Sequence, residues 1–194
     1  MGQRITRANG EASRRRILDA AAAIAGERGY VGTSINDVAT ASGLPKSSIY
    51  WHFSDKDALF AAVIEDSYDQ WLDEFSIRAG SRTLSPAELV VLMHDSLASF
   101  PAFLRFGQLV TLERHESELS ARAKFVEIRR RSLHNMAALF AKATGTDDAT
   151  AASIASVALA LVDGAFLARA AGEHTLDDSS VLGRALEGYI ASVT

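Results

Sequence analysis

The sequence contains no cysteine and only three prolines among its 194 residues. Without cysteine, the chain has no disulfide framework, no zinc finger and no cysteine-ligated iron–sulfur cluster, which suits a reducing compartment. Long apolar stretches are scarce too, because we find no run that approaches a membrane span and no apolar core of a signal peptide. These absences predict a cytoplasmic protein with no metal, no cofactor and no membrane partner.

Common enzyme motifs are also missing. The sequence has no GxSxG nucleophile elbow, no HExxH motif and no glycine-rich phosphate loop, and His115-Glu116 lacks the second histidine of a metal site. We therefore expect that the protein is not an enzyme. Two interpretations remain, namely a DNA-binding protein and a helical small-molecule-binding or adaptor protein without sequence-specific DNA binding.

Residues 33–60 carry helix-start and turn signals at short intervals. Ser34 is a favourable N-cap, and Asp37, three residues later, is placed to accept from the cap amide. Gly43 supplies the positive φ that a sharp helix exit requires, and Pro45 suits the first turn of a following helix. The pattern predicts two short helices that meet at a steep angle.

The second of these helices has two distinct faces. Leu44, Ile49 and Phe53 are expected to turn inward. Hydrogen-bond donors are left on the outer face, namely Lys46, Ser47, Ser48, Tyr50 and His52. Such groups contact base edges and phosphate oxygens, although similar helix pairs occur in proteins that never bind DNA. Ser54, as the expected N-cap of the next helix, and Lys56 in its first turn predict a phosphate site.

From residue 13 to residue 60 the chain resembles the N-terminal domain of the TetR family of bacterial transcriptional regulators. The family pattern is matched without a gap by Gly43, Leu44, Ser48, Ile49, Tyr50, His52, Phe53, Lys56 and Leu59. Ser47 departs from it, because family members often carry glycine or proline there. The DNA-binding residues that we expect are Thr33, Ser34, Asn36, Pro45, Lys46, Ser47, Ser48, Tyr50, Trp51, His52 and Lys56.

The net charge of −4 is unevenly distributed. Residues 1–60 carry eight Lys and Arg against six Asp and Glu, whereas residues 61–194 carry twelve against eighteen. Three consecutive arginines, 14 to 16, fall near the expected start of the first helix, where the helix dipole disfavours cations. A phosphate backbone is the partner that we expect for them, with simple solvation as the alternative. Arg4 and Arg7 precede that helix in a polar arm that could follow a DNA groove.

The rest of the chain shows helical periodicity and no strand pattern. A first helix ends at Gly29, and a long fourth helix begins after Ser54 and runs through Trp71 to about Phe75. Further helices are predicted over residues 87–100, 101–115, 118–142, 149–171 and 179–192. We predict an all-α protein with a three-helix DNA-binding domain over residues 1–60. A larger helical domain for ligand binding and dimerisation would occupy residues 61–194.

The segment 149–171 is apolar nearly all round, so it must be covered on every side. The cover could come from within one subunit, but the resemblance implies that the last two helices form a four-helix bundle with those of a second copy. It also implies an effector pocket in the middle helices. The candidate lining residues are Trp71, His94, Phe100, Phe103, Gln108 and His134, with Phe106 and His115 as further candidates.

The function implied is that of a homodimeric, ligand-responsive regulator, more specifically a repressor that an unknown small molecule releases from a palindromic double-stranded DNA operator. A two-fold dimer presents its two recognition helices one turn of DNA apart, roughly 34 Å. The sequence leaves the effector, the operator and the regulated genes open.

Overall fold

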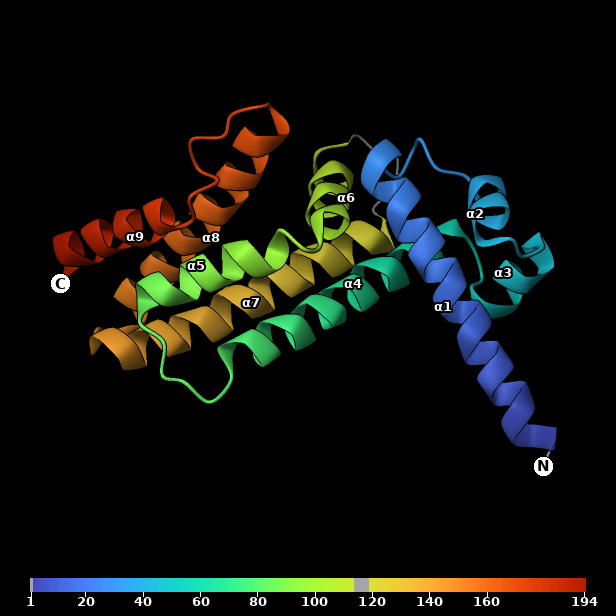
Figure 1. Cartoon of the computed structure of the whole chain (residues 1–194), viewed down its shortest axis with the longest axis horizontal. Helices are drawn as coiled ribbons and strands as arrows, with labels where there is room; N and C mark the ends of the chain where they lie inside the picture. Colours follow the sequence, from blue (N-terminus) through green and yellow to red (C-terminus); the bar gives the residue numbers. More distant parts are fainter. Residues whose placement is uncertain (1, 114–118) are drawn as a thin grey trace. The chain divides into compact units, whose positions relative to one another are not determined.

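The computed structural model in Figure 1 describes residues 2–113 and 119–194, without the side chains of residues 2–8 and residue 101. Over these residues the chain is all-helical, with nine α-helices and no strand, as predicted. The helices are α1 (Gly2–Arg28), α2 (Ile35–Ser42), α3 (Lys46–His52), α4 (Lys56–Ala79), α5 (Pro86–Leu97), α6 (Pro101–Leu112), α7 (Ser120–Thr144), α8 (Asp148–Ala170) and α9 (Ser180–Val193). Every predicted helix is present, although several ends are shifted.

The first helix is longer than predicted. It begins at Gly2, so the segment that contains Arg4 and Arg7 is helical and not an irregular arm. No proline interrupts this segment, and arginine, glutamine and alanine favour the helix. As a result, the three arginines 14 to 16 lie in the interior of α1, where the helix-dipole argument for a phosphate partner does not apply.

The described chain forms two compact packing units. One contains residues 1–70 and 100–128, and the other contains residues 71–99 and 129–194. Helices α4 and α7 therefore contribute residues to both units. The predicted division of function after residue 60 stays a prediction, because a packing unit and a functional domain are defined by different criteria.

The first unit holds α1, α2, α3 and α6 with the first parts of α4 and α7. Helix α1 packs against α6, α2 and α3, and its buried face carries Ile17, Leu18, Ala21 and Ala25. Glycine allows the close approach of α6 to its neighbours. A Cβ on Gly107 would lie 2.0 Å from the ring of Phe125 on α7, so a larger residue there would force the helices apart.

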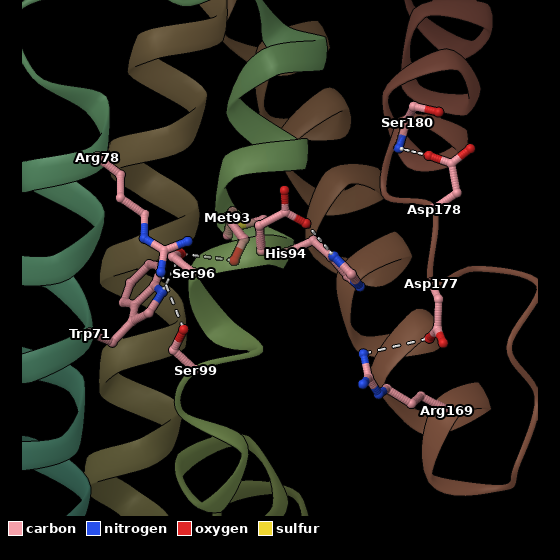
Figure 2. Close-up of polar contacts among 11 residues, drawn as sticks. Trp71, Arg78, Met93, His94, Ser96, Ser99, Arg169, Asp177, Asp178 and Ser180 are labelled. Carbon is pink, nitrogen blue, oxygen red and sulfur yellow. Dashed lines mark hydrogen bonds and ion pairs between the residues drawn. The ribbon is translucent and has the colours of Figure 1, made fainter.

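The second unit holds α5, α8 and α9, which pack on one another, with the later parts of α4 and α7. Two buried polar groups join α4 to α5, because Trp71 donates from Nε1 to Oγ of Ser96 at 2.8 Å (Figure 2). Between α7 and α8, Arg129 donates both terminal nitrogens to Asp163, at 3.1 and 2.6 Å. Nearby on α7, Glu127 pairs with Lys124 at 3.1 Å.

Helix α8 is only partly covered within the chain. Its buried residues are Ala151, Ile154, Ala155, Ala158, Leu159, Val162 and Ala165. An 18-residue window of the helix has a mean hydropathy of 1.9 and is 39% buried. By length and composition α8 could cross a membrane, so the expectation that no apolar run approaches that length is wrong.

Candidate nucleic-acid interface

The turn between α2 and α3 is built as the sequence predicts. Ser34 and Asp37 form a reciprocal capping box, in which the Ser34 amide donates to Asp37 Oδ2 at 2.8 Å. These hydrogen bonds hold the pKa of Asp37 below its usual range. Gly43 adopts φ 65°, so the chain leaves α2 in the left-handed conformation that favours glycine. Pro45 is the N-cap of α3 and not part of its first turn, a shift of one residue from the prediction.

Helix α3 has one face in the core and one face exposed. Ile49 is fully buried and Phe53, its C-cap, is 6% exposed, so these two side chains anchor the helix. Trp51 is 76% exposed and Tyr50 is 53% exposed. Lys46 and Ser47 are exposed too, so α3 presents a cation, a hydroxyl and two aromatic rings on one outer surface. A short helix with this surface can contact base edges and phosphates in a major groove.

A small hollow opens beside this surface. It has a volume of about 270 Å³ and is lined by Ser47, Ser48, Trp51 and His52 of α3 and by Ser13 of α1. Ser13 Oγ lies 2.7 Å from His52 Nε2. Partial burial and the nearby Arg14 guanidinium lower the pKa of His52. Sequence analysis did not identify Ser13, because it lies 39 residues from its partner and belongs to no local motif.

The three consecutive arginines of α1 have intramolecular partners. Arg14 lies over the ring of Phe53, 5.5 Å from its centroid. Arg15 forms a bidentate pair with Asp66 on α4 at 2.7 and 2.9 Å, and Arg16 donates to the carbonyl of Ser42 at 2.6 Å. These contacts join α1 to α2, α4 and the end of α3. Each of the three arginines thus has a role in packing. A phosphate partner is not required to account for their positions.

The start of α4 differs from the prediction. Asp55, not Ser54, caps the helix, because its Oδ1 accepts from the Ala58 amide at 2.8 Å. The side chain of Ser54 instead donates to Asp55 at 3.1 Å. A carboxylate therefore occupies the place where we expected a phosphate. The Lys56 ammonium lies 4.2 Å from the centroid of the Tyr30 ring, and burial lowers its pKa while Glu113 partly opposes that shift.

Two other predicted DNA-binding residues also have structural roles. Thr33 is 1% exposed, and its hydroxyl donates to the Gly29 carbonyl at 2.8 Å, so we remove it from the candidate interface. Ser34 is exposed, but its hydroxyl is used in the capping box. Asn36 and Pro45 are exposed and stay in the candidate set. The structure thus gathers the candidate interface on α3 and its flanks.

The predicted effector-pocket residues are not gathered in the same way. Trp71, His94 and His134 belong to the second packing unit, whereas Phe100, Phe103 and Gln108 belong to the first. None of them lines the hollow beside α3 or a groove of about 370 Å³ between α5 and α9.

Individual contacts explain several of these positions. Trp71 and Phe103 are buried core residues; the Phe103 ring contacts Tyr68 and Phe125, and the Phe106 ring contacts Phe60. His94 lies 3.1 Å from Asp95, and His134 is exposed. His115 lies outside the described residues. Which residues line a pocket stays a prediction.

Comparison with known proteins agrees with this geometry. The sequence model of the bacterial regulatory proteins of the tetR family matches residues 17–63. The HTH-type transcriptional regulator AcrR of Shigella flexneri is 37% identical over 62 residues, which cover 32% of this chain and 29% of AcrR. The HTH-type transcriptional repressor KstR2 of Rhodococcus jostii is 30% identical over 95 residues, which cover 48% of this chain and 47% of KstR2. The matched segments thus span less than half of each relative.

Solved structures resemble nearly the whole chain. A TetR-family regulator from Cytophaga hutchinsonii has a TM-score of 0.75 at 23% identity, over 95% of this chain and 96% of that one. The regulator FadR from Bacillus subtilis, solved with stearoyl-CoA, has a TM-score of 0.68 at 17% identity, over 91% and 96%. These likenesses confirm the predicted fold, an N-terminal helix-turn-helix followed by a helical domain. The matched family is not one of enzymes, in agreement with the sequence analysis.

Proposed function

We propose that this chain, whose residues 17–63 match the tetR family of bacterial regulatory proteins, binds a palindromic DNA operator as a homodimer and regulates transcription. The observation that carries this proposal is the outer surface of α3. Lys46, Tyr50 and Trp51 are exposed there, while Ile49 holds the helix in the core. Two neighbouring exposed aromatic side chains form an apolar patch of the kind that marks an interaction site. Next to a cation, such a patch suits a DNA groove.

In the proposed complex, α3 enters the major groove. Lys46 and Ser47, at the start of α3, would contact base edges, because the N-terminal part of a recognition helix reaches deepest. Ser48, Tyr50 and His52 would hold the phosphate backbone and set the register of the helix. Lys56 is a less direct candidate, because its ammonium already lies over Tyr30. Its contribution to DNA binding would require that contact to open.

Homodimerisation through α8 and α9 is the second part of the proposal. One face of α8 is left uncovered in the single chain, and it carries Ala152, Ser156, Ala160, Gly164 and Leu167. Small residues at this spacing permit close helix packing, and Leu167 is 64% exposed. A second copy would cover this face and place two α3 helices about one DNA turn apart.

Regulation by a small molecule is the third part. KstR2 is described as a repressor, and FadR was solved with stearoyl-CoA, which supports a repressor with a largely apolar effector here. Binding of the effector to the helical domain would favour a state in which α4 has moved and the two α3 helices no longer fit their half-sites. Ordinary coupling of about 1–3 kcal/mol would give partial release of DNA. The compartment of such a regulator is the cytoplasm.

The DNA part is tested by incubating the purified chain with sheared genomic DNA, recovering the bound fragments and sequencing them. We expect one enriched palindromic motif, and we expect the variant Lys46→Ala to change or lose that motif. A matched control is Lys142→Ala, which removes a lysine near the end of α7. Recovery of fragments without a shared motif would favour a helical binding or adaptor protein instead.

The effector part is tested separately. A compound that raises the melting temperature of the free protein binds its native state. If that compound is the inducer, operator DNA must weaken its binding by the same factor by which the compound weakens DNA binding. A compound whose affinity is unchanged by the operator is not the inducer.

A further inference from the structure

A hydrogen-bonded chain connects α1 to the end of the recognition helix. The Ser13 hydroxyl donates to the carbonyl of Gly10, one turn earlier in α1, at 2.9 Å. The same oxygen lies 2.7 Å from Nε2 of His52. A hydroxyl has one hydrogen to donate, and here the Gly10 carbonyl takes it. The Ser13 oxygen is therefore the acceptor in its contact with His52, and Nε2 of the imidazole carries the hydrogen.

With the hydrogen on Nε2, the protonation state of the His52 ring decides whether Nδ1 accepts or donates a hydrogen bond. In the neutral ring only one nitrogen carries hydrogen, so Nδ1 is then an acceptor. A phosphate oxygen is also an acceptor and would repel it. Once the ring is protonated, Nδ1 becomes a charged donor that a phosphate oxygen can accept from.

The surroundings of His52 favour a phosphate over a base. The hollow next to the ring is also lined by Ser48, whose hydroxyl can donate to a phosphate oxygen. The charged group that acts on His52 from α1 is Arg14, and Lys46 is the cation on α3 itself. The ring of Trp51 stands edge-on to the imidazole, 4.5 Å between centroids. Partial burial and the Arg14 guanidinium oppose protonation of His52 in the free protein, and a phosphate in the hollow would favour it.

We propose that Ser13 is a positioning residue that makes DNA binding take up a proton, because it fixes His52 with Nδ1 as the atom that meets a backbone phosphate. This inference rests on the proposed DNA binding and adds its regulation by pH. As pH falls, operator affinity rises through the pKa of His52 in the complex and levels off below its pKa in the free protein. Removal of Ser13 frees the ring to carry its hydrogen on Nδ1, and a neutral His52 can then donate to the phosphate without taking up a proton.

The experiment measures operator affinity from about pH 8 to about pH 6 at constant ionic strength, because phosphate contacts are sensitive to salt. For the wild-type dimer, which brings one His52 to each half-site, we expect operator affinity to change by up to about a hundredfold per pH unit, the limit for two protons. His52→Gln should remove this slope. Ser13→Ala should flatten it, and Ser13→Thr should restore it because threonine keeps the hydroxyl. A purely structural role of Ser13 would shift the whole curve without changing its slope.

A matched control and a direct reading of the ring complete the test. His174→Gln removes an exposed histidine of the α8–α9 turn and should leave the slope unchanged. Long-range ¹H–¹⁵N correlation spectra of free wild-type protein should show the Nε2–H form of His52, and those of Ser13→Ala a mixture. A wild-type slope equal to that of His52→Gln, or an unchanged slope in Ser13→Ala, would overturn the proposal. Absence of specific DNA binding at every pH would overturn the proposed function instead.

Discussion

Asp57, in the first turn of α4, accepts hydrogen bonds from the backbone amides of Ser120 and Ala121, at 2.8 and 3.3 Å. The carboxylate of one helix thus caps the start of another helix that lies 63 residues away. Lys124 and Glu65 add a second contact between α7 and α4 at 3.4 Å. Helix α4 begins directly after α3, so these contacts join the recognition helix to α7 within the first packing unit.

Replacement of Asp57 tests this cap. Asp57→Ala should lower the free energy of unfolding by about 0.5–2 kcal/mol, because two amides at the start of α7 lose their acceptor. Chemical denaturation monitored by circular dichroism measures the change. Asp69→Ala removes an exposed carboxylate of the same helix and should change stability by less than about 0.5 kcal/mol. Equal effects of the two substitutions would show that the cap contributes nothing.

A second prediction concerns the start of α4. Asp55→Ala should lower the melting temperature more than Ser54→Ala, since Asp55 accepts from the helix amide and Ser54 only supports it. The same hydrogen bonds lower the pKa of Asp55 below its ordinary value of 3.8. A lowered carboxyl pKa contributes stability above the unfolded value and loses it as pH falls through the folded value. The gap between wild type and Asp55→Ala should therefore shrink in acid, and a gap that widens would contradict the assignment.

Replacement of the exposed Trp51 should weaken operator binding with little effect on the stability of the fold. Because the side chain is 76% exposed, Trp51→Ala should change the free energy of unfolding by less than about 0.5 kcal/mol. Operator affinity should fall by about tenfold to a hundredfold, since covering a large apolar side chain contributes about 1.5–3 kcal/mol. Val31→Ala, which truncates another exposed apolar side chain, is the control. If both variants bind the operator as wild type does, Trp51 is not part of the interface.

A fourth prediction concerns assembly. Ala160→Glu places a charge on the uncovered face of α8 and should convert a dimer into monomers, because an unpaired buried charge costs several kcal/mol. Ala138→Glu makes the same change at an exposed position of α7 and should leave the dimer intact. Sedimentation measures the mass of both. Leu186 is unsuitable, because it is fully buried within the single chain and a charge there would unfold it. A wild-type monomer would contradict the proposed interface.

The elements that sequence predicted well are those fixed by local chemistry. The capping box of Ser34 and Asp37, the left-handed Gly43 and the inward Ile49 all involve neighbours within a few residues. The same locality explains the correct outward placement of Lys46 and Tyr50. The family pattern added the fold of the remaining chain, because it implied a helical domain that composition alone could not distinguish from other helical proteins.

The elements that sequence missed depend on residues far apart in the chain. Nothing near Ser13 indicates His52, and nothing near Asp57 indicates the start of α7. Thr33 is donor-bearing in sequence, yet its hydroxyl is used inside the core. The sequence predicted Lys56 as a phosphate ligand, but its ammonium lies over the ring of Tyr30. Tertiary contacts decide whether a polar side chain faces solvent, and a local pattern does not contain them.

The most direct test is the affinity of the wild-type chain for the recovered operator, compared with the same duplex carrying one or both half-sites scrambled. The measurement is made by fluorescence anisotropy at physiological salt. We predict that scrambling both half-sites weakens binding by at least about a thousandfold, the lower end for specific recognition, and that scrambling one gives an intermediate loss. Equal affinity for all three duplexes would contradict sequence-specific binding by a dimer through α3.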